Sequence, residues 1–126
     1  KNIDLDGKFV KLHILATSGE GQFWPLAPLY YNVADVVLIM YSITEKESFE
    51  IAKNWYTELS VKGPDSLKCA LAGCKEDMRV LREVLEEDLH SFAVEKDIPV
   101  CMEISCKTGK NIEKLFSSIC RYSLGK

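Results

Sequence analysis

The run Asp35-Val36-Val37-Leu38-Ile39-Met40-Tyr41-Ser42-Ile43 indicates the fold class of this chain. Its apolar residues are continuous rather than alternating with polar ones, which is typical of a strand covered on both faces. Two further runs of strand length, at 67–73 and 98–104, follow it. Such strands favour a mostly parallel sheet, because helices cover both faces of sheets of that kind.

Helical patterns alternate with these strands. Apolar residues recur at helical intervals in three segments, around 49–59, 85–93 and 112–120. Thr44 and Glu47 have the spacing of a capping box, and Gly63-Pro64 should end the first helix. Asn111 is placed to cap the last helix.

A hairpin is expected ahead of these units. Asp6-Gly7 separates two short extended runs, 3–5 and 9–15, and an Asp-Gly pair is a strong hairpin signal because the turn needs positive φ. Residues 17–33 read as a long, irregular loop. The order of a hairpin and then three strand–helix units predicts the α/β class, with a three-layer, doubly wound, mostly parallel sheet.

Composition narrows the function classes. The 126 residues suffice for one domain or part of one, and 47% of them are apolar. The net charge is −3 and the basic residues are scattered, so the sequence does not indicate a basic surface for binding nucleic acid. The longest apolar run falls short of the roughly 18 residues of a membrane span. The five cysteines form no C-x-x-C pair, which argues against a zinc site and fits buried thiols in a reducing cytoplasm.

The segment K-L-H-I-L-A-T-S-G-E-G-Q-F at 11–23 resembles the strand-to-switch segment of Rab-type small GTPases. Other segments match that family in the same order: Asp6-Gly7-Lys8, Leu29-Tyr30-Tyr31, Ser48-Phe49, Asn54-Trp55, Arg82-Glu83-Val84 and Thr108-Gly109-Lys110-Asn111. The resemblance identifies residues 1–126 as a partial Rab-like domain of the Ras superfamily. It implies a P-loop GTPase fold, N-terminally truncated, whose first strand and phosphate loop would lie ahead of Lys1.

The resemblance also implies a guanine site. Cys74-Lys75-Glu76-Asp77 stands where the family has Asn-Lys-x-Asp, and Ser105-Cys106-Lys107 where it has Ser-Ala-Lys. The candidate base-binding residues are Lys75, Asp77, Ser105, Cys106 and Lys107. Asp77 would accept the N1 and N2 hydrogens of guanine, whereas the Cys74 thiol cannot replace an asparagine amide that ties two loops together. The alternative is that Asp77 is a turn residue and Lys107 a surface lysine.

The phosphate side departs further from the family pattern. No Gly-x-x-x-x-Gly-Lys-Ser/Thr loop occurs in the sequence. Ala16 stands where the family's magnesium-binding aspartate would be, and Glu20 replaces the catalytic glutamine. Gly19 keeps an amide that a γ-phosphate would need. The resemblance therefore implies weak binding of GTP or GDP, no normal Mg²⁺ site, and hydrolysis slowed by several orders of magnitude.

Partners are expected at the hairpin and the second-switch region, where Trp24, Tyr30 and Tyr31 lie. Tryptophan favours interface cores, although Trp24 would also fit folded back over the helix beneath it. A preceding GTPase domain or another chain would supply the missing strand. The chain ends without a prenylation box, so we expect a cytoplasmic protein that reaches membranes, if it does, through a partner or a missing tail.

Three interpretations of function remain. In the first, the domain is a pseudo-GTPase that acts through protein interactions in membrane traffic or signalling. In the second, it is a working GTP/GDP switch whose phosphate loop lies outside this chain. The third is an unrelated enzyme that uses His13 or His90 with a cysteine, and it is disfavoured because neither histidine lies near a nucleophile-like motif.

Overall fold

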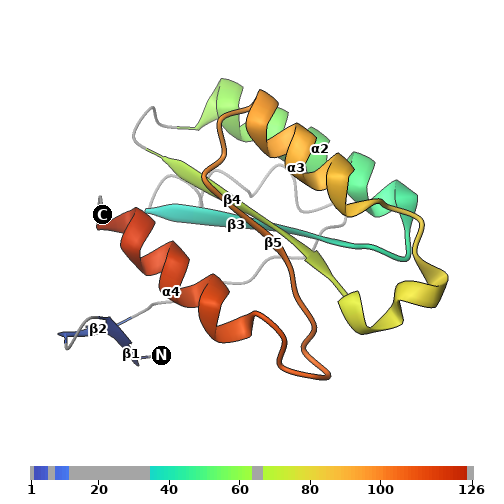
Figure 1. Ribbon diagram of the computed structural model, residues 1–126. Helices are drawn as coiled ribbons and strands as arrows, with labels where there is room; N and C mark the ends of the chain where they lie inside the picture. The colour runs from blue at the N-terminus through green and yellow to red at the C-terminus, as the bar shows by residue number, and fades with distance from the viewer. Residues whose placement is uncertain (1, 6–7, 12–34, 64–66, 125–126) are drawn as a thin grey trace, which may run out of the picture.

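The computed structural model describes residues 2–5, 8–11, 35–63 and 67–124. Within these ranges, three parallel strands in the order β3-β4-β5 form the main sheet: β3 (Val36–Ser42), β4 (Lys68–Cys74) and β5 (Val100–Glu103). The helices are α2 (Lys46–Lys62), the 3₁₀ helix η2 (Glu76–Leu81), α3 (Glu86–Glu95) and α4 (Ile112–Ser123). Helices α2 and α3 cover one face of the sheet and α4 covers the other (Figure 1). The prediction of a three-layer α/β fold is confirmed.

The central strand shows why the apolar runs are continuous. Ala70 and Ala72 of β4 pack toward α4, whereas Leu71 between them packs toward α2 and α3. All three are almost completely buried. Because alternate side chains of a strand point to opposite faces, a strand between two helical layers needs an apolar residue at every position.

Among the described residues, two clusters of buried side chains form the core. The larger lies between the sheet and the pair α2 and α3, and comprises Ile39, Tyr41, Ile43, Phe49, Ala52, Leu59, Leu71, Val84, Leu89, Ala93 and Ile98. The smaller lies under α4 and comprises Ala70, Ala72, Val100, Ile104, Leu115 and Ile119. Burying one large aliphatic side chain stabilises the fold by about 1.5–3 kcal/mol.

Tyr41 explains the glycine at the end of β4. A Cβ atom added to Gly73 would lie 2.7 Å from the Tyr41 hydroxyl oxygen and 2.8 Å from the ring carbon that bears it. The tyrosine ring therefore occupies the space that a side chain at Gly73 would need. Any residue larger than glycine at this position would have to displace that ring.

The predicted N-terminal hairpin is confirmed in part. Strand β1 (Asn2–Leu5) pairs antiparallel with β2 (Lys8–Lys11), and Leu5 lies opposite Lys8. That register leaves a two-residue connection, as an Asp-Gly turn requires. The hairpin forms its own two-stranded sheet and β1 lies beside α4 (Figure 1). The expected continuation of the second strand to residue 15, and the expected loop at 17–33, lie outside the described residues.

Two helix starts differ from the capping predictions. Helix α2 has Glu45 as its N-cap residue, with no side-chain cap bond, and the Thr44 hydroxyl instead pairs with the Ser42 hydroxyl at 2.7 Å. The capping-box prediction was therefore wrong. Asn111 does precede α4, but its side-chain amide donates to the Glu103 carbonyl at 2.8 Å and does not cap the helix. The prediction that α2 ends at Gly63 is confirmed.

Candidate functional site

Two loops meet where strands β4 and β5 end. We call residues 75–77 the first loop and residues 105–110 the second loop. The Ile104 amide donates to the Gly73 carbonyl at 2.7 Å, and the Glu76 amide donates to the Ile104 carbonyl at 3.0 Å. The loops therefore leave the sheet side by side. The crevice beyond the carboxyl ends of parallel strands is where α/β proteins bind ligands.

The two predicted base-binding residues, one from each loop, are in direct contact. Ser105 is fully buried, and its hydroxyl donates to Asp77 Oδ1 at 2.6 Å. A bond of that length from a hydroxyl to a carboxylate is charge-assisted and strong. The same Ser105 oxygen accepts from the Thr108 amide at 3.2 Å. These bonds orient the Asp77 carboxylate, and two carboxylate oxygens provide enough lone pairs to accept further donors.

The remaining predicted base-binding residues surround this pair. Lys75 is exposed and has a left-handed backbone conformation with φ 65°. Such a conformation costs a non-glycine residue about 1–2 kcal/mol, and it turns the chain sharply between β4 and η2. Cys106 and Lys107 are both exposed on the second loop. The structure thus brings together five predicted residues: Lys75, Asp77, Ser105, Cys106 and Lys107.

The predicted phosphate-side and partner residues lie outside the described residues. These are Ala16, Gly19, Glu20, Trp24, Tyr30 and Tyr31. Their roles therefore stay predictions.

Cys74 ends strand β4 as a half-buried thiol. Burial is the main cause that raises the pKa of Cys74 to about 11, and the neighbouring Cys106 raises it further. The thiol therefore stays protonated at neutral pH. Because a neutral thiol is a weak donor and a weak acceptor, Cys74 is poorly suited to hold the two loops together.

Sequence reasoning missed a second contact between the loops. The Glu76 side chain is only 8% exposed, and its Oε2 accepts from Lys110 Nζ at 2.8 Å. Arg79 approaches the same oxygen at 3.6 Å. Glu76 and Lys110 are 34 positions apart, so no short-range sequence pattern predicts their contact.

A third polar contact lies beyond the first loop, where the chain leaves η2. Arg82 forms a two-pronged bond with Glu103, with distances of 2.6 and 2.8 Å to the two carboxylate oxygens. Arg82 also donates to the Val84 carbonyl at 2.7 Å, while the Glu103 side chain is only 4% exposed. The bond to Glu103 is the main cause that raises the pKa of Arg82. The pair fastens the chain after η2 to strand β5.

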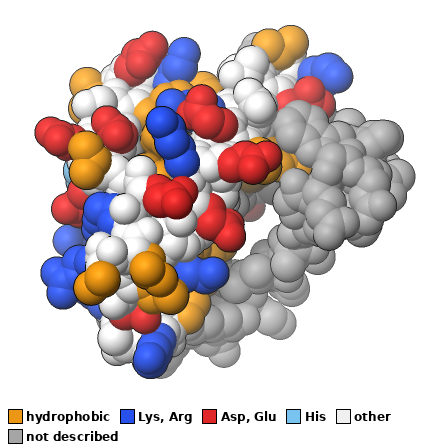
Figure 2. Space-filling view, turned by 90° about the vertical axis from the view of Figure 1, so that its right-hand side faces the viewer, with side chains coloured by type: hydrophobic (Ala, Val, Ile, Leu, Met, Phe, Trp, Pro, Cys, Tyr) orange, Lys and Arg blue, Asp and Glu red, His pale blue; other side chains and the backbone are white. Residues whose placement is uncertain are grey.

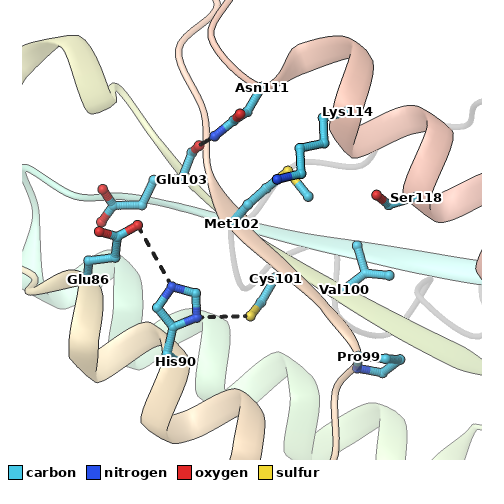
Figure 3. Close-up of a pocket in the computed structure, with 10 residues that line it drawn as sticks. All are labelled: Glu86, His90, Pro99, Val100, Cys101, Met102, Glu103, Asn111, Lys114 and Ser118. Carbon is cyan, nitrogen blue, oxygen red and sulfur yellow. Dashed lines mark hydrogen bonds and ion pairs between the residues drawn. The ribbon is translucent and has the colours of Figure 1, made fainter.

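A separate hollow contains His90, one of the two histidines considered for an unrelated enzyme. It measures about 400 Å³ and lies between α3, β5 and α4. Figure 3 shows His90 between Cys101 and Glu86: Nδ1 lies 3.4 Å from Cys101 Sγ, and Nε2 lies 3.8 Å from Glu86 Oε2. The structure thus pairs His90 with a cysteine, which the sequence motifs did not indicate. His13 lies outside the described residues.

The chemistry of this hollow does not favour a nucleophile. Burial raises the pKa of the Cys101 thiol, whereas reactive cysteines have lowered values. None of Lys75, Asp77, Ser105, Cys106 and Lys107 lines the hollow.

The end of the molecule that carries the two loops has a mixed surface. Acidic and basic side chains are interspersed there, with separate hydrophobic patches between them (Figure 2). Met78, Val80 and Leu81 of η2 are exposed, Val80 to 99%.

Over the described ranges, no helix is long and apolar enough to cross a membrane. The same residues contain no group of three or more histidine, cysteine or acidic side chains arranged to hold a metal ion.

The family model and the relatives of similar sequence point to the same protein family. The model of the Ras family matches residues 1–124. The chain is 37% identical over 121 residues to the Ras-related protein Rab-22A of Mus musculus, which covers 96% of this chain and 62% of that protein. It is 38% identical over 112 residues to the Ras-related protein RABF2b of Arabidopsis thaliana, covering 89% and 56%. It is 37% identical over 113 residues to the GTP-binding protein ypt5 of Schizosaccharomyces pombe, covering 89% and 53%. The chain therefore spans between 53% and 62% of the length of these relatives.

Proposed function

Because the chain belongs to the Ras family and is a Rab-like small GTPase domain, we propose that it recognises guanine, hydrolyses GTP poorly, and acts by binding other proteins in membrane traffic. The observation that carries the first part is the bond between Ser105 and Asp77, 2.6 Å long. It orients a carboxylate just beyond the carboxyl ends of β4 and β5. Guanine presents two adjacent donors, N1–H and N2–H, that match the two oxygens of such a carboxylate.

The neighbours of Asp77 supply the other contacts that a purine base needs. The aliphatic stem of exposed Lys75 would cover one face of the base, as lysine stems do over apolar surfaces. The backbone amides near Cys106 and Lys107 would donate to the guanine O6. Adenine carries an amino group at the position of O6 and has no N1 hydrogen, so the same groups would discriminate against it.

The weak hydrolysis is proposed from residue identities on the phosphate side. Ala16 has no oxygen to offer a magnesium ion, so the residue present does not fit that ion at this position. Glu20 places a negative charge where a glutamine would orient water, and two like charges about 4 Å apart repel by about 4 kcal/mol at an effective dielectric of 20. Both changes disfavour a magnesium-dependent attack on GTP.

A second candidate, a working GTP/GDP switch, is favoured by the same Ser105–Asp77 bond. It differs from the first in requiring a normal phosphate and magnesium site. The relatives are whole proteins of which this chain matches little more than half, so both candidates concern the complete protein.

One titration separates the candidates. The full-length protein is titrated with a fluorescent GDP analogue with and without Mg²⁺, with the matching ADP analogue as the control nucleotide, and GTP turnover is then measured. We expect GDP binding that Mg²⁺ changes by less than about threefold and turnover at least about 10³-fold below that of an active Rab. Strong Mg²⁺ dependence with ordinary turnover would support the switch instead. Equal binding of GDP and ADP would contradict guanine recognition.

The protein-binding part of the proposal is tested at Trp24. Partners recovered with the wild-type protein from cells should be lost with Trp24→Ala. Val94→Ala is the control, since Val94 is an apolar side chain 81% exposed on α3. Equal recovery with all three proteins would place the partner surface elsewhere.

A further inference from the structure

Glu76 is a buried carboxylate that reaches from one loop to the other. The residue is 6% exposed, and its Oε2 accepts from Lys110 Nζ at 2.8 Å. The bond to Lys110 is the main cause that lowers the pKa of Glu76, and Arg79 and Arg82 contribute further. A carboxylate removed from water is costly unless it is paired. The charge of Glu76 is therefore stabilised chiefly by Lys110, with Arg79 as a second neighbour.

We call the bond between Glu76 and Lys110 the tie. Its two residues adjoin Asp77 and Ser105, which carry the proposed base contact. Glu76 immediately precedes Asp77. The Lys110 carbonyl accepts from the Ser105 amide at 3.2 Å, which closes the second loop back on Ser105. The Glu76–Lys110 bond and the Asp77–Ser105 bond thus join the same two loops.

We propose that Glu76 and Lys110 are positioning residues for base recognition. Their ion pair holds the first loop and the second loop at the separation at which the Asp77 carboxylate is oriented by Ser105. This inference rests on the proposed guanine recognition. It gives the two loops a connection that the protonated thiol of Cys74 is poorly suited to provide.

The competing explanation is that the pair only adds stability. A matched control is available in α2, where Lys62 Nζ lies 3.4 Å from Glu58 Oε1 and the Glu58 side chain is 16% exposed. That pair is remote from both loops. Removing it tests what the loss of one ion pair does by itself.

The experiment uses the full-length protein and four changes: Glu76→Gln, Lys110→Met, the double change, and Glu58→Gln. Two readouts are taken, the Kd for the fluorescent GDP analogue and the amide hydrogen exchange of Thr108 and Gly109. We expect each single loop change to raise the Kd about tenfold and to speed exchange at both amides. The double change should be no worse than either single one, because both remove the same contact. Glu58→Gln should alter neither readout.

Lys110→Arg adds a conservative test, since Lys110 is half exposed and its replacement should leave the core intact. Arginine keeps the charge and should restore the Kd to within about threefold of wild type.

Three outcomes would overturn the inference in distinguishable ways. Unchanged exchange at Thr108 and Gly109 in Glu76→Gln would overturn the tie itself. Faster exchange with an unchanged Kd would overturn its positioning role. Failure of the wild-type protein to bind GDP at all would overturn the proposed guanine recognition and the positioning role with it, and the exchange rates would still decide whether the tie fastens the loops.

Discussion

Ser105 and Asp77 lie 28 positions apart in the chain and are joined by a hydrogen bond of 2.6 Å. Each residue follows a different strand of the parallel sheet, and the strands bring them together because their carboxyl ends lie at one edge. The buried hydroxyl has two tasks, since it donates to the Asp77 carboxylate and accepts from the Thr108 amide.

Ser105→Ala should remove both bonds while leaving the strand in place. We expect unfolding in urea to require about 1–3 kcal/mol less free energy, since hydrogen bonds to charged groups contribute on that scale. The Kd for GDP should rise about tenfold, because the carboxylate loses its orientation. Ser60→Ala is the control, since the Ser60 hydroxyl donates to the Thr57 carbonyl on exposed α2. An unchanged Kd in Ser105→Ala would show that Asp77 needs no such orientation.

Arg82→Met should be among the more destabilising single changes in the described part of the chain. It leaves the Glu103 carboxylate buried without its two-pronged partner, and removing one member of a buried pair costs about 3–5 kcal/mol. Arg79→Met is the matched control, because Arg79 is 68% exposed and 3.6 Å from its carboxylate, a geometry worth about 1 kcal/mol or less. Urea unfolding measures both. Equal losses in the two variants would mean that Glu103 finds another partner or water.

The fold could be predicted from sequence because its signals are local. Strands β3 and β4 contain the continuous apolar runs 36–41 and 69–72, which are typical of strands covered on both faces. The hairpin could be predicted from Asp6-Gly7, because such a pair favours a tight turn between two strands. The capping prediction failed because the Thr44 hydroxyl found a closer partner, Ser42, at the end of the preceding strand.

The candidate site was predictable only where a family motif marked it. The loop residues Asp77 and Ser105 were found through their resemblance to family motifs, and the structure places them in contact. Glu76–Lys110 and His90–Cys101 are pairs distant in sequence, 34 and 11 positions apart. Their contacts depend on how the strands and helices are arranged, and a single sequence carries no pattern for that.

The Glu76 carboxylate should make stability depend on pH in acid solution. Its pKa is lowered in the folded protein from an ordinary value of 4.5, chiefly by Lys110 and then by Arg79 and Arg82. Between the two values the unfolded chain binds more protons than the folded one, so stability rises with pH there. The stabilisation is complete above pH 4.5 and is lost as the pH falls through the lowered value. Urea midpoints of wild type and Glu76→Gln should thus differ by a constant amount well above pH 4.5 and converge as the pH falls through the lowered pKa of Glu76. A difference that grows in acid would contradict this assignment.

The cysteines should differ in their reactivity in an order set by exposure and by thiolate content. Cys106 is exposed, Cys101 is half-buried with a raised pKa, and burial raises the pKa of Cys69 and Cys74 to about 11. At pH 8 a thiol with that pKa is only about 0.1% thiolate, and the thiolate is the species that reacts. Timed alkylation with iodoacetamide, followed by peptide mass spectrometry, should therefore label Cys106 first. Cys106→Ser should abolish the fast phase. Labelling of Cys101 ahead of Cys106 would mean that His90 accepts the proton of the Cys101 thiol. The hollow between α3 and β5 would then be a candidate reactive site.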